Sequence, residues 1–149
     1  MRLLKGLLSG APLNRDLGLL ILRVGIGLSM LILHGWGKIT GGPELWENVG
    51  GSMSNLGLNF APKFWGFLAA FAESVGSVLL ILGLFFRPAA LMLTFTMLVA
   101  MVMHLSLPED NPGSGWNAAS HAMELMLVYL ALFLMGSGKF ALATKRGRA

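Results

Sequence analysis

The hydrophobic positions of this chain gather into four long runs, over residues 17–34, 64–86, 89–107 and 119–135. Each run is close to the length of about 20 residues that an α-helix needs to cross about 30 Å of hydrocarbon. A segment in lipid must satisfy its own backbone hydrogen bonds, so each run is expected to be helical. The polar stripes of soluble amphipathic helices are missing, which disfavours a soluble bundle. The pattern therefore predicts an all-α integral membrane protein, an antiparallel bundle of four transmembrane helices.

Composition supports this class and excludes others. Apolar residues make up 55% of the 149 residues and charged residues only 12%, whereas soluble domains carry roughly 25% charged residues. The mean hydropathy of +0.71 also excludes a disordered chain. The chain has no cysteine, which excludes disulfides, thiol catalysis and iron–sulfur ligation.

The lysines and arginines predict the orientation of a single membrane domain, residues 1–149. The outer loops are expected at 35–63 and 108–118, and a basic cytoplasmic tail at 144–149. Eight cations fall on the side of the N-terminus: Arg2, Lys5, Arg15, Arg87, Lys139, Lys145, Arg146 and Arg148. Only Lys38 and Lys63 fall on the other side, so both termini are predicted to be cytoplasmic. Membrane topology explains the net charge of +4 better than nucleic-acid binding does.

Ionisable residues within the apolar runs are the candidates for function, because a charge at mid-bilayer costs roughly 2.5–3.5 kcal/mol on insertion scales. Arg23 and His34 are eleven residues apart and share a helix face. Lys38 extends that face only if the helix continues past His34. Glu73 lies near the middle of the second run, at a depth comparable to Arg23. We therefore predict an Arg23–Glu73 interaction, as either a functional or a structural ion pair.

A second polar group lies in the fourth run, where Asn117, His121 and Glu124 follow an i, i+4, i+7 pattern on one face. The spacing of His121 and Glu124 is of the kind used in bundle metal sites, and a plain histidine–carboxylate hydrogen bond is the simpler interpretation. Together with His34, these residues predict a polar column from the outer surface to mid-bilayer. Such a column indicates a pocket open to the outer side.

Metal binding has one further candidate site. Met101 and His104 share a face at the end of the third run, and thioether with imidazole suits copper. Methionines in such a chain are mostly packing residues, so we expect no metal site.

Several motifs together resemble the DoxX family of small four-helix bacterial and archaeal membrane proteins. The resemblance covers roughly residues 15–142. The matching pieces are Arg23-Val24-Gly25, His34-Gly35-Trp36-Gly37-Lys38, Glu73-Ser74-Val75-Gly76, the turn Gly83-Leu84-Phe85-Phe86-Arg87-Pro88-Ala89, Glu124, and the segment 136–142.

The resemblance implies a redox-associated subunit of the cytoplasmic (inner) membrane, because the family is similar to the quinone-linked membrane subunit of archaeal thiosulfate oxidation. Other members are tied to oxidative-stress or metal-stress genes. A quinone is then the candidate cofactor, and a redox protein or a second copy of the chain the candidate partner. His34, Lys38, Glu73, His121 and Glu124 are the candidates for ligand binding or proton exchange, with Arg23 as the electrostatic partner.

The alternative is a non-catalytic membrane component: a scaffold, a lipid or small-molecule carrier, or a stress-response accessory protein. The chain has no self-contained catalytic motif. The sequence therefore leaves open whether it is an enzyme.

Overall fold

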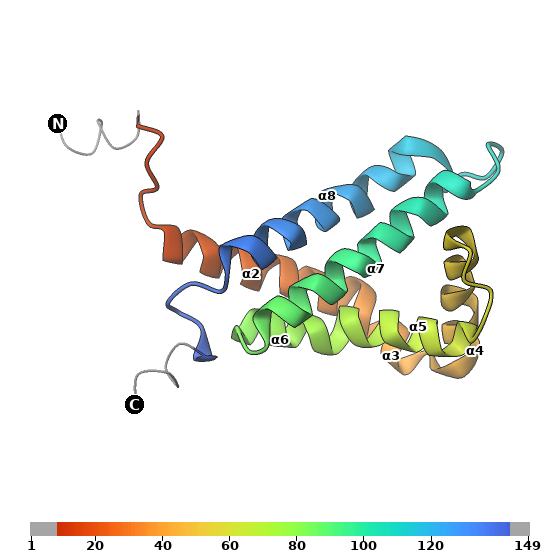
Figure 1. Ribbon diagram of the computed structural model, residues 1–149, viewed down its shortest axis with the longest axis horizontal. Coiled ribbons are helices and arrows are strands. Elements are labelled where there is room, and N and C mark those ends of the chain that lie inside the picture. The colour runs from red at the N-terminus through yellow and green to blue at the C-terminus, as the bar shows by residue number, and fades with distance from the viewer. Residues whose placement is uncertain (1–8, 144–149) are drawn as a thin grey trace.

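The computed structural model describes residues 9–143, and all regular elements in that range are helical (Figure 1). Four helices are long and apolar enough to cross a membrane, as predicted: Arg15–Thr40, Pro62–Leu82, Phe86–Ser106 and Gly115–Met135. The predicted basic tail 144–149 and the cations Arg2 and Lys5 lie outside the described residues.

Two of the four spans are interrupted by a π-helical turn. The first span consists of α2 (Arg15–Met30), the π-turn η1 (Leu31–Gly35) and α3 (Trp36–Thr40). The second consists of α5 (Pro62–Phe71), the π-turn η3 (Ala72–Gly76) and α6 (Ser77–Leu82). The third and fourth spans are the uninterrupted helices α7 (Phe86–Ser106) and α8 (Gly115–Met135).

Local sequence signals set several helix ends. The side chain of Asn14 accepts a hydrogen bond from the backbone N–H of Leu17, 3.0 Å away, and this cap fixes the start of α2. Pro62 opens α5, a position where its missing N–H costs nothing. Gly83 ends α6 with a φ of 69°, a left-handed conformation that glycine adopts without strain.

The segment 35–63, which the sequence predicts to be a loop, is mostly helical. The first span runs on to Thr40, and α4 (Gly42–Gly50) and the 3₁₀-helix η2 (Gly51–Leu56) follow. Helix α4 packs so closely on α5 that a Cβ at Gly50 would collide with the backbone of Pro62, and one at Gly66 with the backbone of Trp46. This close packing holds α4 and η2 beside the membrane-spanning helices.

The core lies where the four spans come together. Leu19 and Met30 of α2 pack there with Leu93 of α7 and Tyr129 of α8. Helices α7 and α8 form a hairpin, and α2 lies against α6. Toward the end of the bundle that carries α4, the hairpin diverges from α5 (Figure 1). This divergence leaves room for a cavity between α5, α7 and the α4–η2 segment.

Candidate functional site

The two π-turns pack against each other at the middle of the bundle. Gly35 of η1 lies so close to η3 that a Cβ on it would collide with the backbone of Glu73. Single π-turns inside α-helices are often found at functional sites. In this chain the two π-turns place the last part of the first span against the middle of the second. Lys38 follows one turn after η1.

Lys38 and Glu73 form an ion pair at this junction. The Lys38 ammonium donates a hydrogen bond of 2.7 Å to Oε1 of Glu73. The Glu73 side chain is 2% exposed and the Lys38 side chain 29% exposed. The pair forms because the first helix continues through Gly35 and carries Lys38 to the depth of Glu73.

The predicted Arg23–Glu73 pair is therefore wrong. Arg23 is only 1% exposed, and its guanidinium donates to the backbone carbonyls of Ser137, at 3.0 Å, and Phe140, at 2.7 Å. The segment after α8 turns back along α2, where the Lys139 N–H also donates to the Asp16 carboxylate at 3.0 Å. Backbone carbonyls thus take the place of the expected carboxylate, and Arg23 anchors the C-terminal segment.

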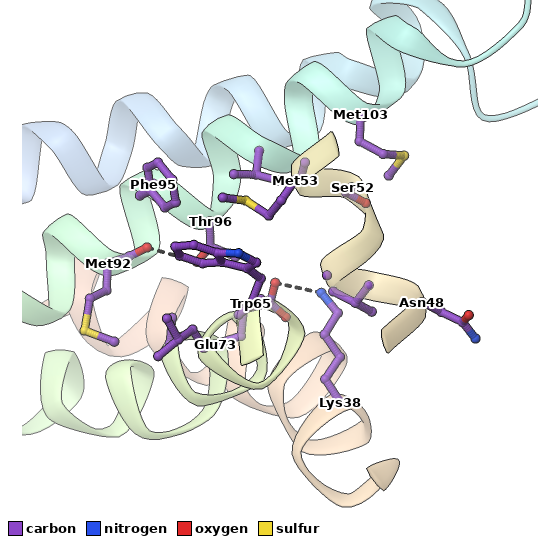
Figure 2. A pocket seen from close by; sticks show the side chains of 17 residues that line it. Lys38, Asn48, Ser52, Met53, Trp65, Glu73, Met92, Phe95, Thr96 and Met103 are labelled. Carbon is purple, nitrogen blue, oxygen red and sulfur yellow. Dashed lines mark hydrogen bonds and ion pairs between the residues drawn. The ribbon is translucent and has the colours of Figure 1, made fainter. Parts of the chain in front are cut away.

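The ion pair lies in the wall of a cavity of about 630 Å³. This volume is within the range of roughly 300–1,000 Å³ that is typical of small-molecule sites. Figure 2 shows the indole of Trp65 among the lining side chains, with the Lys38–Glu73 pair in the same wall. The remaining wall is mainly apolar and includes Met53 of η2 and Phe95 of α7.

Two polar atoms of the cavity residues lack a partner. Oε2 of Glu73 and Nε1 of Trp65 are buried and make no hydrogen bond within the described part of the chain. A buried polar group left unpaired costs about 1–3 kcal/mol. Two residues of the cavity wall thus carry an unpaired acceptor and an unpaired donor, both covered by neighbouring atoms, near the Lys38 ammonium. A ligand with an oxygen and a hydroxyl could pair with both.

Two further unpaired groups lie nearby in the core. The Tyr129 hydroxyl of α8 and the Ser77 hydroxyl of α6 are fully buried and have no hydrogen-bond partner among residues 9–143. Together with Oε2 of Glu73, these two hydroxyls are buried polar groups that the described chain leaves unsatisfied.

The remaining sequence candidates lie elsewhere. The rings of His34 and His121 lie 6.0 Å apart between centroids, but neither residue lines the cavity, and neither does Glu124. His121 and Glu124 are both exposed on α8, and no hydrogen bond joins them in the described part of the chain. The structure therefore places the five predicted ligand-binding residues in two groups, one in the cavity and one outside it.

His104, which the sequence offers with Met101 as a candidate copper ligand, has a structural contact in the fold. Nδ1 of His104 lies 2.7 Å from the carbonyl oxygen of Gly113, so the ring ties the end of α7 to the α7–α8 connection. Within residues 9–143 no group of three or more histidine, cysteine or acidic side chains is arranged to hold a metal ion.

Sequence reasoning did not identify Trp65 or the α4–η2 segment as part of a site. One signal in the sequence could have indicated the α4–η2 segment: the expected loop contains the large apolar residues Leu45, Trp46 and Met53. That pattern fits a helix lying on the bundle better than a solvated loop.

Comparison with known proteins identifies a matching family. The model of the DoxX family matches residues 18–105, a range that includes both π-turns, Lys38, Glu73 and Trp65. Neither the curated proteins nor the solved structures give a match.

Proposed function

The chain belongs to the DoxX family, and we propose that it is a redox-associated membrane subunit that binds a quinone-like amphiphile in the cavity. One observation carries the proposal. A mainly apolar cavity holds a buried ion pair, and two polar atoms in its wall have no partner within the described chain. An apolar pocket with a few converging polar groups is typical of a small-molecule site.

The free groups match the chemistry of a quinone head. The indole N–H of Trp65 and the ammonium of Lys38 are donors, and a quinone oxygen accepts from such groups. Oε2 of Glu73 is an acceptor, and the hydroxyl of a quinol donates to it. The apolar wall around Met53 and Phe95 would take the ring and hydrocarbon tail.

A redox role requires a partner protein as the source of the electrons that reduce the quinone. A quinone that becomes a quinol takes up two electrons and two protons. In this proposal the electrons come from the redox centre of a partner protein, and Glu73 and Lys38 exchange protons at the quinone oxygens. The chain itself binds and orients the ligand. His34, His121 and Glu124 have no part in this step because they do not line the cavity.

Quenching of tryptophan fluorescence tests the proposal. Quinones quench nearby indoles, so we expect decylubiquinone to quench the purified protein saturably. The Trp65→Phe variant should lose most of the saturable part. Trp116→Phe is the matched control, because Trp116 is 64% exposed on α8 and does not line the cavity. Equal quenching of both variants, or quenching linear in quinone concentration, contradicts the proposal.

A second variant separates binding from folding. Ala100 of α7 lines the cavity, so the phenyl group of Ala100→Phe should obstruct part of it and weaken saturable quenching while the protein stays folded. Leu91→Phe is the control, since Leu91 is 52% exposed on the same helix. Stable binding of ordinary lipid in place of quinone would favour the alternative, a non-catalytic carrier or scaffold.

We propose the cytoplasmic membrane as the location, with both termini inside. The support is the uneven distribution of lysine and arginine, with eight of these residues on the side of the termini and two on the other. The chain has no cysteine, so single cysteines can report orientation. In intact cells an impermeant maleimide should label Lys63→Cys and spare Arg87→Cys, and the reverse result contradicts the orientation.

A further inference from the structure

The outward face of α8 carries a carboxylate that the described chain leaves without a partner. Glu124 lies midway along α8, a membrane-spanning helix, and is exposed. No hydrogen bond or ion pair involves Glu124 within residues 9–143. A charged side chain at this depth rarely faces lipid and usually meets a polar partner. An exposed carboxylate here indicates that something covers the face.

The same face supplies a complement to the carboxylate. His121 lies one turn nearer the α7–α8 connection and is also exposed. Asn117 extends the polar part of the face. Met135, eleven residues after Glu124 and so about 20° from it around the helix, is also exposed and continues the face toward the other end of α8. One helix face thus carries a hydrogen-bonding imidazole, a carboxylate and an apolar side chain.

We propose that this face binds the same face of a second copy of the chain. Copies inserted in the same orientation place their α8 helices side by side and parallel, related by a two-fold axis. If the helices cross between positions 121 and 124, each His121 meets Glu124 of the partner subunit. The two pairs are then identical, as a two-fold interface requires. Met135 extends the contact with apolar packing.

Within the described chain the face of α8 around Glu124 is exposed, and at its edge the ring of His121 lies 6.0 Å from the ring of His34. Within one chain α8 packs mainly on α7, and its buried residues are Ala119, Ala122, Tyr129 and Leu132. Ala119, Ala122 and Tyr129 lie on the opposite side of the helix from Glu124, and Leu132 lies on its flank. The proposed dimer therefore leaves the cavity between α5, α7 and η2 unchanged, and it stands independently of the quinone proposal.

Disulfide cross-linking in native membranes tests the dimer, because the chain has no cysteine of its own. Asn117→Cys lies on the proposed face, and Leu105→Cys is the control, an exposed position near the same end of α7. With a mild oxidant we expect most of the Asn117→Cys protein to run as a dimer, at least five times the fraction found for Leu105→Cys. Equal dimer fractions overturn the proposal.

A charge exchange tests the reciprocal pairing. In the Asn117→Cys background, Glu124→Ala should lower the cross-linked fraction several-fold. The double variant His121→Glu, Glu124→His keeps both partners in exchanged positions, so it should restore the fraction. A double variant that cross-links no better than Glu124→Ala overturns the pairing, as does a wild-type protein with the mass of one copy in detergent. Cross-linking to a protein of another mass assigns the face to a different partner and also overturns the proposal.

Discussion

Replacing Lys38 by methionine tests the ion pair in the wall of the cavity. The variant removes the ammonium that lies 2.7 Å from Oε1 of Glu73 and leaves a carboxylate that is 2% exposed. Methionine keeps much of the apolar stem of lysine, so the change isolates the charge. We expect the folded protein to be destabilised.

The magnitude follows from the distance and the burial. Two unit charges 2.7 Å apart attract each other by about 6 kcal/mol at an effective dielectric constant of about 20. Desolvation of the carboxylate offsets much of this attraction. Removing one partner of a buried pair costs about 3–5 kcal/mol, and we take the lower end because the Lys38 side chain is 29% exposed. A loss of about 3 kcal/mol lowers the Tm by roughly 6–12 °C for a chain of this size.

The assay is thermal unfolding of the purified protein in mild detergent, followed by tryptophan fluorescence. Lys63→Met is the matched control, because the Lys63–Glu47 pair is exposed on both sides, at 60% and 52%, and should change the Tm little. The double variant Lys38→Met, Glu73→Leu should recover most of the loss, since an apolar pair can replace a buried ion pair. A Tm of Lys38→Met within 2 °C of the Lys63→Met control would refute the reasoning.

Three further variants test other contacts, two by the same thermal assay and one by limited proteolysis. Gly35→Ala should lower the Tm strongly because its methyl group would collide with the backbone of Glu73, whereas Gly37→Ala, with open space around it, should not; equal effects contradict the close packing of the π-turns. Arg23→Gln should expose the segment after α8 to protease, because it removes the bonds to the carbonyls of Ser137 and Phe140; unchanged proteolysis contradicts that anchor. Tyr129→Phe should leave the Tm unchanged or raise it, since its buried hydroxyl has no partner in the described chain, and a lower Tm would reveal a partner such as bound water.

The four spans could be predicted because the physics that sets them is local. A run of about 20 apolar residues must be helical in lipid, and the residues of each run show this directly. The chain from residue 35 to 63 was harder, because glycines such as Gly35 and Gly50 suggest a loop. In the structure these glycines serve close packing between helix backbones, which depends on a neighbour that the local sequence does not show.

The sequence was enough to identify the charged residues of the site but not to predict which of them pair with each other. Lys38 and Glu73 were both candidates, and they come together because η1 continues the first helix. The prediction that Arg23 pairs with Glu73 rested on opposite charge and comparable depth. Its true partners are backbone carbonyls of residues 137 and 140, and every residue type carries a carbonyl. No side-chain pattern marks such a contact, so the sequence could not reveal it.

The most direct test of the central claim is native mass spectrometry of the protein released from mild detergent, with identification of every bound small molecule. Wild type and the surface control Leu91→Phe should carry a quinone, and Ala100→Phe should carry less of it while staying folded, because Ala100 lines the cavity and Leu91 does not. The same set of bulk lipids in all three samples, with no quinone in any, would contradict the account.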